Sequence, residues 1–390
     1  MENFDVLESL VRVSLAGNVD AIRHQILRMA DRLEAEGHLR EAKSLRAQTR
    51  RSERLQAVEP LKLSPSERSP ARLRGQRLTP KTSLPVDKET VAPLCEVIFP
   101  APYSQALILP EEALESFASL VREWQHEERL EEHGLSVSRT LLIYGPPGTG
   151  KTTLALSIAA KLALPVVMAR LDGLISSLLG NTARNLGALF DFCNRHECVL
   201  ILDEFDAVAK VRDDSNEVGE IKRVVNALLQ NLDIRVTYGL TIAITNHEQL
   251  LDSAIWRRFE HQIRLSMPSK QIRHDIAMDL LRGRSDADEI SRAISFWTEG
   301  RSGADVRTLA LSFLKYLVLA DSELPTPWKA LRSAAGATGI VPDGLGQDSD
   351  ADVARKLHLS ESGILTNDLA LFFGRDRRTI TRWLSNLSGV

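Results

Sequence analysis

The sequence predicts an α/β protein built on a parallel β-sheet, and two observations support this fold class. Between residues 92 and 266, short β-branched and aliphatic runs alternate with amphipathic helical stretches, which is the pattern of βαβ units. One of these runs leads directly into the glycine-rich segment GPPGTGKT at residues 145–152, and a helical stretch follows. Strand, glycine-rich loop and helix in that order indicate a phosphate-binding loop.

Composition restricts the class of protein further. The chain has 390 residues, of which 43% are hydrophobic and 26% charged, with a net charge of −3. No apolar run approaches the roughly 18 residues of a membrane-spanning helix, and the start MENFDVLESL lacks a secretory signal. We therefore expect a cytoplasmic protein without membrane contact. The three cysteines, Cys95, Cys193 and Cys198, have no metal-binding spacing and are expected to be buried thiols.

The N-terminal part differs from the rest. Residues 1–56 show apolar positions at helical spacing, which predicts a helical unit that binds a partner or oligomerises. The alternative is a helical extension that packs on the next domain. Residues 57–91 contain scattered Pro, Ser and Arg and predict a flexible linker. Its basic residues either contact acidic partners or nucleic acid, or belong to a solvated tether.

Five aliphatic runs in the core predict strands, and their near-continuous apolarity predicts that helices cover both faces of the sheet. They lie at residues 140–144, 165–169, 199–202, 240–244 and 262–265. The sequence becomes helical again over residues 267–335, and a Gly/Asp-rich stretch then introduces a C-terminal extension at residues 336–390.

The glycine-rich segment predicts an ATP site with Mg²⁺. Its glycines let backbone N–H groups turn toward the phosphates, and the following helix directs its positive end there. Lys151 supplies charge to the β- and γ-phosphates, while the Thr152 hydroxyl enters the magnesium shell. The predicted nucleotide-binding residues here are Gly145, Pro146, Pro147, Gly148, Thr149, Gly150, Lys151, Thr152 and Thr153.

Two adjacent acids follow another apolar run. Asp203 and Glu204 come directly after Val199-Leu200-Ile201-Leu202, so they are expected at the carboxyl end of a buried strand, beside the loop of the first strand. Asp203 is predicted to orient magnesium through its water shell, and Glu204 to polarise the attacking water. Surface acids that merely end a strand are disfavoured, because four aliphatic residues bury the strand as far as Asp203.

These segments resemble the core of the AAA family over roughly residues 92–322: the glycine-rich loop, Asp203-Glu204-Phe205-Asp206, and Ala243-Ile244-Thr245-Asn246. The resemblance implies the P-loop NTPase (AAA+) fold, with a parallel sheet and a helical lid at residues 267–335. It also implies an ATPase that works as a ring, a homo-oligomer expected to be hexameric. By this match Asn246 is a sensor that helps to hold the attacking water.

Two further segments extend the resemblance. Leu251 to Phe259 is similar to the segment that carries arginine fingers, so Arg257 and Arg258 are expected to reach a neighbouring subunit's nucleotide. Alternatively, one of them only pairs with Glu260 or another surface acid. The run SGADV at residues 302–306 resembles the family's lid motif. That match implies that Gly303 and Ala304 lie against the adenine and ribose. Arg307 could be a second sensor on the phosphates, but that role is generally absent in the subgroup that the motif resembles, so Arg307 is expected to be an exposed lid residue.

The resemblance also bears on the partner. Leu178 takes the position where AAA unfoldases present an aromatic side chain to a central pore; the alternative is a core residue of a short helix. The stretch from Asp203 to Arg258 is most similar to bacterial AAA ATPases encoded beside subtilisin-like serine peptidases. This implies a peptidase partner in a defence or stress response, although this chain lacks G-x-S-x-G and H-E-x-x-H motifs of its own.

The segment at residues 369–383 resembles a helix-turn-helix, in which Arg375, Arg377, Arg378 and Arg382 would face DNA phosphates. Such a hairpin can instead contact protein or pack on the lid. Three functions follow from the sequence. The first is a ring motor that remodels or regulates a protein client or an associated peptidase. The second is a DNA-associated AAA+ regulator, and the third is a nucleotide-gated scaffold with negligible turnover.

Overall fold

The computed structural model describes residue 30 and residues 75–385, except 88, 100–106, 172–178, 208–217, 236–238, 321–324, 342–347 and 360–363. The chain divides into two compact units, Met1–Ser69 and Pro70–Val390. The helical unit predicted over residues 1–56 lies outside the described residues apart from Ala30, which is helical. The following description concerns the second unit.

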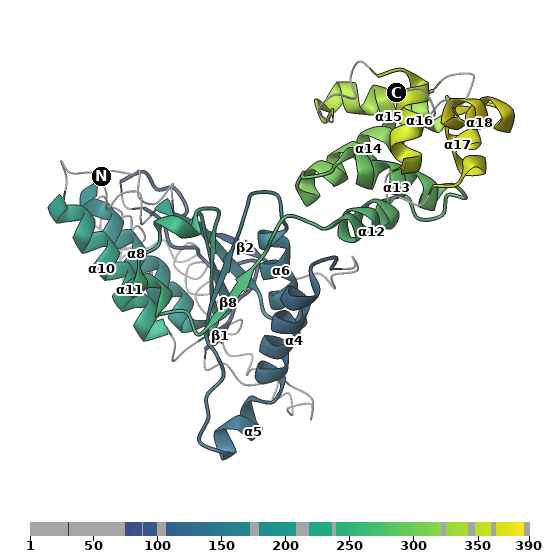
Figure 1. The fold of residues 1–390 in the computed structure, drawn as a ribbon. Helices are drawn as coiled ribbons and strands as arrows, with labels where there is room; N and C mark the ends of the chain where they lie inside the picture. Colours follow the sequence, from purple (N-terminus) through teal and green to yellow (C-terminus); the bar gives the residue numbers. More distant parts are fainter. Residues whose placement is uncertain are drawn as a thin grey trace, which may run out of the picture. The chain divides into compact units, whose positions relative to one another are not determined.

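A six-stranded sheet lies between two layers of helices in the second unit (Figure 1). Its spatial order is β2-β4-β6-β7-β3-β8. All neighbouring strands are parallel except β2, which pairs antiparallel with β4 at one edge. Each of the five predicted runs overlaps one of the parallel strands, and the parallel-dominated sheet confirms the predicted fold class. The strands are β2 (Glu96–Ile98), β3 (Thr140–Tyr144), β4 (Val166–Arg170), β6 (Val199–Asp203), β7 (Thr241–Thr245) and β8 (His261–Arg264).

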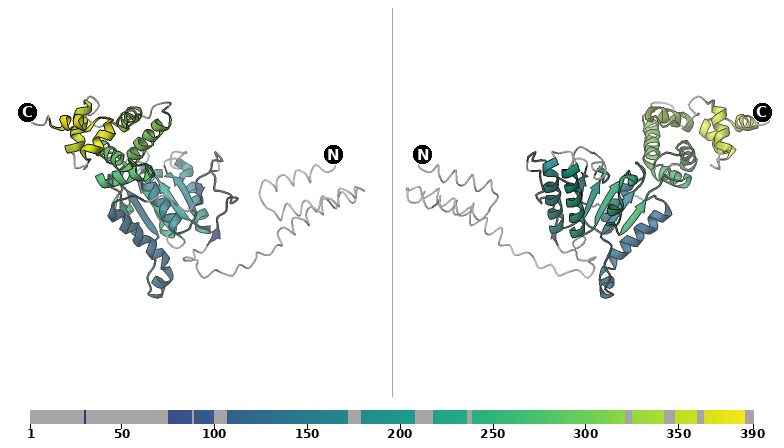
Figure 2. Two further views of the ribbon diagram at one scale, coloured as in Figure 1. Left: turned by 90° about the vertical axis from the view of Figure 1, so that its right-hand side faces the viewer. Right: turned by 60° about the vertical axis from the view of Figure 1, so that its left-hand side comes forward.

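Helices cover both faces of this sheet (Figures 1 and 2). On one face lie α4 (Glu111–Gln125) and α6 (Lys151–Lys161), and on the other lie α8 (Leu179–Arg195) and α10 (Val218–Arg235). Strand β3 shows the two-residue period that produces this arrangement: Leu141 and Ile143 belong to the core under α4 and α6, whereas Leu142 belongs to the opposite core. Each fully buried aliphatic side chain contributes roughly 1.5–3 kcal/mol to folding, so both faces hold the sheet in place.

The linker expected over residues 57–91 differs from the structure in its described part. β1 (Gln76–Arg77) pairs in parallel with β5 (His196–Glu197), and Leu78 and Leu94 are buried in the sheet's core. The segment of residues 75–99 is therefore attached to the core at a few buried positions, Leu78, Leu94 and Cys95, although most of its side chains are exposed. The prolines here indicated a linker, but the apolar residues that anchor the segment are too far apart to show a periodic pattern.

Asp87 fixes this segment to α8. Its carboxylate accepts hydrogen bonds from the backbone N–H groups of Glu89 (2.8 Å) and Thr90 (2.9 Å) and from Asn185 Nδ2 (2.5 Å). The backbone hydrogen bond from Thr90, with those from Asn185 and Glu89, lowers the pKa of Asp87 to about 2. Because the folded pKa is depressed, this contribution to stability is complete above the ordinary pKa of 3.8 and is lost as the pH falls toward 2.

The residues after the sheet form one helical region rather than a lid and a separate extension. Its members share a single hydrophobic core that includes Ala277 near the start and Ile380 near the end. The expected boundary between residues 335 and 336 falls inside α15. The helices are α12 (Lys270–Leu280), α13 (Ala287–Trp297), α14 (Gly303–Val318), α15 (Pro327–Thr338), α16 (Asp350–Leu359), α17 (Thr366–Phe373) and α18 (Arg377–Ser385).

A series of aromatic contacts explains why the extension packs on the lid. Trp328 lies 5.5 Å from Trp297 and 5.1 Å from Phe373 between ring centroids, and Phe373 lies 5.7 Å from Trp383. Trp328 Nε1 also donates to Asp350 Oδ1 at 2.7 Å. Aromatic side chains bury large areas, so these contacts bring α16, α17 and α18 into the lid core.

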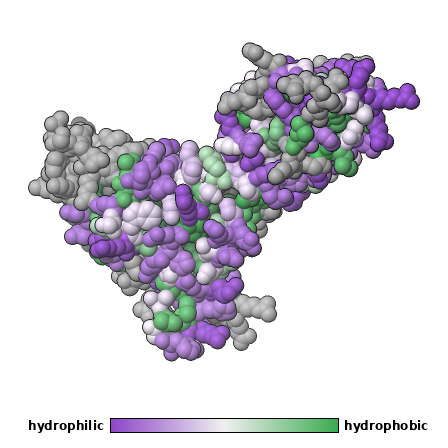
Figure 3. All heavy atoms as spheres, in the orientation of Figure 1, coloured by the Kyte–Doolittle hydropathy of each residue, from purple (hydrophilic) through white to green (hydrophobic). Residues whose placement is uncertain are grey.

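The face of the described part that Figure 3 shows is mixed in character. Hydrophilic residues predominate in the view of Figure 3, with smaller hydrophobic areas between them. Among the described helices, none combines the length and the apolar composition that crossing a bilayer requires.

Candidate nucleotide-binding site

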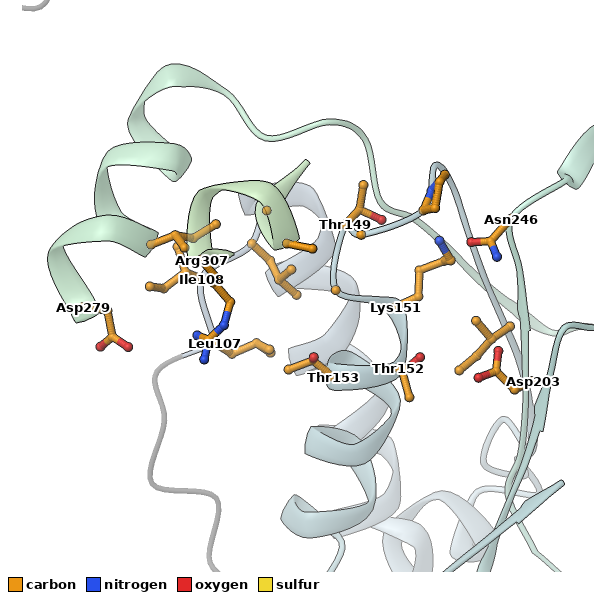
Figure 4. Close-up of a pocket in the computed structure, with 18 of the residues that line it drawn as sticks. Leu107, Ile108, Thr149, Lys151, Thr152, Thr153, Asp203, Asn246, Asp279 and Arg307 are labelled. Carbon is orange, nitrogen blue, oxygen red and sulfur yellow. The ribbon is translucent and has the colours of Figure 1, made fainter. Parts of the chain in front are cut away.

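A pocket of about 610 Å³ lies where the carboxyl ends of β3, β6 and β7 meet the N-termini of α6 and α14. Its size falls in the range of small-molecule sites, about 300–1,000 Å³. In Figure 4, Lys151, Thr152, Asp203 and Asn246 lie toward one end, and Leu107, Ile108, Asp279 and Arg307 lie toward the other. The pocket is lined by Leu107, Ile108, Leu109, Pro147, Gly148, Thr149, Gly150, Lys151, Thr152, Thr153, Asp203, Glu204, Ile244, Asn246, Ile276, Asp279, Gly303, Ala304 and Arg307.

The loop before α6 adopts a conformation that requires glycine. Gly145, Gly148 and Gly150 have φ angles of 137°, 74° and 98°, in the range that side chains disfavour. A Cβ on Gly145 would lie 2.0 Å from the carbonyl oxygen of Leu265, and one on Gly148 would lie 2.5 Å from Ser302 Oγ. The loop is thus closely packed between the end of β8 and the start of α14, which holds its backbone in a fixed curve.

Lys151 begins α6, and its ammonium lies inside this curve. The residue is only 6% exposed, and Nζ donates to the carbonyl oxygens of Gly145 (2.8 Å) and Pro146 (2.7 Å). Burial lowers the pKa of Lys151, while the charges of Asp203, Glu248 and Asp206 act in the opposite direction. Gly145 and Pro146 therefore hold the lysine, whereas the predicted residues from Pro147 to Thr153 form the pocket wall.

The two acids stand at the end of β6. Asp203 is the last residue of the strand and accepts a hydrogen bond from the backbone N–H of Glu204 at 2.9 Å. Glu204 has a φ of 54°, a conformation that costs on the order of 1 kcal/mol for a residue other than glycine. Its Oε1 lies 3.0 Å from Nη2 of Arg170, at the end of the neighbouring β4. This ion pair is a feature that the sequence did not predict.

The strand order at Asn246 differs from the expected one. The sequence suggested that the acids lie directly beside the loop of β3, but β7 separates β3 from β6. Asn246 follows β7 and lines the pocket between them. The end of β7 is fixed because Thr245 Oγ1 donates to Asp206 Oδ1 at 3.1 Å and accepts from the backbone N–H of His247 at 3.0 Å.

The lid reaches the loop through the N-terminus of α14. Ser302 and Asp305 form a capping box there, and the backbone N–H of Ala304 donates to the Gly148 carbonyl at 3.0 Å. A Cβ on Gly303 would lie 3.3 Å from Ile276 Cδ1 and 3.4 Å from the Gly148 oxygen. Both predicted lid residues, Gly303 and Ala304, therefore line the pocket in contact with the loop.

Several lining residues were missed by sequence reasoning. Leu107, Ile108 and Leu109 precede α4, and Ile276 lies on α12; these apolar side chains suit the base of a nucleotide. They belong to no motif, so only the fold brings them to the pocket. Arg307 is exposed, as expected, yet it also lines the pocket, at the end opposite Lys151 (Figure 4).

Arg257 and Arg258 lie outside the pocket wall as the described residues form it. Arg258 pairs with Asp233, with 3.2 Å between Nε and Oδ1, and its Nη1 donates to the Ala254 carbonyl at 2.8 Å. Arg257 caps the end of α11 (Ser253–Trp256) and is exposed. The two arginines thus differ in their surroundings. Leu178, the expected pore residue, lies outside the described residues.

The oxygen donors at the Lys151 end fit a magnesium ion. The Thr152 hydroxyl and the Asp203 carboxylate both line the pocket, and Mg²⁺ prefers one or two such protein ligands together with waters and substrate phosphates. Thr152 and Asp203 are therefore the residues that would hold Mg²⁺.

Comparison with known proteins is consistent with this geometry. Residues 141–267 match the family described as "ATPase family associated with various cellular activities (AAA)". An uncharacterized AAA family ATPase of Sinorhizobium fredii is 42% identical over 180 residues, which cover 46% of this chain and 54% of that protein. The 26S proteasome regulatory subunit 10B homolog A of Arabidopsis thaliana is 31% identical over 198 residues, covering 49% of this chain and 50% of the subunit.

Two further similarities complete the comparison. The ATP-dependent zinc metalloprotease FtsH of Thermus thermophilus is 31% identical over 240 residues, covering 60% of this chain and 38% of FtsH. The crystal structure of the FIGL-1 AAA domain shares the fold, with a TM-score of 0.52 at 21% identity; it covers 68% of this chain and 90% of that domain. The chain thus spans about half the length of these curated relatives, or less.

Proposed function

We propose that this chain, whose residues 141–267 form an AAA ATPase domain, hydrolyses ATP as a ring-forming motor that remodels or regulates a protein partner. The observation that carries the proposal is the pocket itself. It brings Lys151, Thr152, Asp203 and Asn246 to one end and Leu107 and Ile108 to the other, and Glu204 also lines it.

The Lys151 end supplies charge and donors to phosphates. Among the described residues, Nζ of Lys151 donates to two neutral carbonyls, at 2.7 and 2.8 Å. Phosphate oxygens are better acceptors, because hydrogen bonds between charged groups are stronger. The N-terminus of α6 adds its backbone N–H groups and its dipole. Mg²⁺ held by Thr152 and Asp203 would offset the charge of the phosphates, while Leu107 to Leu109, Ile276, Gly303 and Ala304 would enclose the base and ribose.

Glu204 is the residue that would polarise the attacking water, with the Asn246 amide helping to position it. The pairing with Arg170 opposes this role, because a carboxylate that already accepts from a guanidinium is a weaker acceptor for a water proton. Both groups are solvent-accessible, with the Arg170 side chain 64% and the Glu204 side chain 39% exposed. The pair is thus worth less than about 1 kcal/mol and can open readily.

In an assembled ring, an arginine of the neighbouring subunit would add a further positive charge beside the phosphates. We assign the finger role first to Arg257, because it is exposed and would be available to a neighbouring subunit. Arg258 is engaged by Asp233 of its own chain, a surface acid other than Glu260, and the alternative interpretation of the sequence allowed such a pairing for one of the two arginines. Glu260 is instead an acceptor for the backbone N–H of Arg139. In this proposal Arg258 supports the finger segment.

A protein partner is favoured by the relatives that carry this domain. They include a proteasome regulatory subunit homolog and a protease that depends on ATP. A subtilisin-like peptidase, as implied by the sequence resemblance, is our specific candidate for an associated partner. Within this proposal, the N-terminal residues 1–56 would bind that partner or the client, and Leu178 would be an apolar contact in the pore.

Replacement of Glu204 by Gln tests hydrolysis directly. We expect Glu204→Gln to bind ATP as the parent does but to release phosphate at least about 100-fold more slowly, since general-base catalysis contributes roughly 10²–10⁴-fold. Steady-state phosphate release and equilibrium ATP binding measure the two effects separately. Turnover equal to the parent's would refute the motor. Negligible turnover by the parent itself would favour the nucleotide-gated scaffold.

Replacement of Arg170 by Met tests the restraint on Glu204. Loss of the ion pair should remove the guanidinium from the carboxylate and raise kcat by at most about fivefold, which corresponds to about 1 kcal/mol. Arg195→Met, which removes an exposed arginine at the end of α8 away from the pocket, should leave kcat unchanged. A lower kcat in Arg170→Met would show that Arg170 assists Glu204 instead of restraining it.

Mixing two inactive variants tests action between subunits. Arg257→Ala should lose on the order of 1,000-fold in kcat, whereas Arg258→Ala should lose far less. Glu204→Gln subunits retain Arg257, so mixing them with Arg257→Ala subunits should restore part of the phosphate release. Full activity of Arg257→Ala alone, or no recovery on mixing when the subunits co-assemble, would contradict an action between subunits.

A further inference from the structure

The last three helices form a unit whose geometry is set by its turns. α16, α17 and α18 pack on one another. The turn at residues 374–376 joins α17 to α18. Gly374 ends α17 with a φ of 62°, and a Cβ there would lie 2.4 Å from Thr326 Cγ2. Asp376 then begins α18 by accepting from the backbone N–H of Thr379 at 2.8 Å. A three-residue turn containing glycine is typical of a helix-turn-helix.

Helix α18 has two chemically different faces. Ile380 is fully buried, and Trp383 and Leu384 pack against the core of the helical region. These positions follow the spacing of one helical face. The outer face borders a hollow of about 540 Å³, lined by Arg377, Arg378, Thr381, Arg382 and Ser385. Arg375, in the preceding turn, is also exposed.

The outer face of α18 is basic. The segment of α18, RRTITRWLS, contains no acid. Asp376 caps α18, and Asp368 accepts from the Leu365 N–H within the cap of α17. Elsewhere in the helical region, exposed arginines pair with aspartates, as Arg282 does with Asp279 and Arg292 with Asp288. Among the described residues, no carboxylate lies within ion-pair distance of the four arginines at residues 375–382.

We propose that the outer face of α18 binds duplex DNA through its phosphates, with α18 directed at the major groove. The nine residues of α18 span about 14 Å, and the major groove, about 12 Å wide, admits one α-helix. The four arginines match the guanidinium donors that contact phosphates, whereas the hydroxyls of Thr381 and Ser385 donate to carbonyls of α18 itself. Docking leaves the buried Ile380 face undisturbed, so binding requires no rearrangement of the helical core.

The proposal commits to duplex DNA rather than to an acidic protein. DNA offers phosphates at regular intervals along each strand, and their neutralisation releases counterions. The logarithm of the binding constant therefore falls linearly with the logarithm of salt concentration, by about 0.9 for each phosphate contact. The slope therefore measures how many phosphates the arginines contact. If α18 had only a structural role, replacing its arginines would not change this slope.

The test uses the full-length protein without nucleotide, so that it is independent of ATP hydrolysis. Binding of a fluorescent duplex of about 30 base pairs is followed by anisotropy between about 50 and 300 mM salt. We expect Arg378→Ala with Arg382→Ala to weaken binding at least about tenfold at 100 mM salt and to reduce the slope by about 2. The corresponding double Lys variant should keep the slope.

The matched control removes two arginines from the same helical region, Arg282→Ala with Arg292→Ala, and should bind as the parent does. Three results would overturn the proposal. The first is that the parent does not bind the duplex at about 50 mM salt. The second is that the Arg378/Arg382 variant retains the parent's slope, which would place DNA binding elsewhere, such as on the basic residues of 57–91. Displacement of the duplex by polyglutamate as readily as by unlabelled duplex would indicate an acidic protein ligand instead.

Discussion

The buried ammonium of Lys151, held inside a curve of backbone carbonyls, is the interaction on which the rest of the site depends. The ammonium donates hydrogen bonds to the carbonyls of Gly145 and Pro146. On the outside of the loop, the end of β8 packs closely against Gly145 and the start of α14 packs closely against Gly148. Such a cationic cradle is costly to bury without a partner. The lowered pKa of Lys151 records that cost, and a phosphate anion would offset it.

The strand order and the lid determine which residues surround the Lys151 loop. Because β7 lies between β3 and β6, Asn246 stands between the loop and the acid pair. The Ala304 N–H joins the Gly148 carbonyl to α14, and α14 shares its hydrophobic core with α18. Helix α14 therefore contacts the nucleotide loop at its N-terminus and belongs to the same helical core as α18. In the proposed mechanism, the Arg170–Glu204 pair restrains the carboxylate that would polarise the attacking water.

What the sequence could predict was local. The glycine-rich loop, the acid pair and the five parallel strands each depend on contiguous residues, and the structure brings Lys151, Asp203, Glu204 and Asn246 into one pocket. Features that depend on distant residues were missed. Leu107 to Leu109 carry no motif, and the Arg170–Glu204 pair joins residues 34 positions apart. The Gly/Asp-rich stretch after residue 335 suggests a domain boundary, and nothing in its sequence shows that α12 and α18 share one hydrophobic core.

The most direct test of this account is the equilibrium binding of Mg²⁺-ATP to the parent and to Lys151→Met, measured by calorimetry. Lys161→Met, at the exposed end of the same helix, is the matched control. We predict that Lys151→Met weakens binding on the order of 100-fold, about 2.7 kcal/mol, whereas the control binds as the parent does. Equal affinity in the parent and Lys151→Met, or no ATP binding by the parent, would contradict the account.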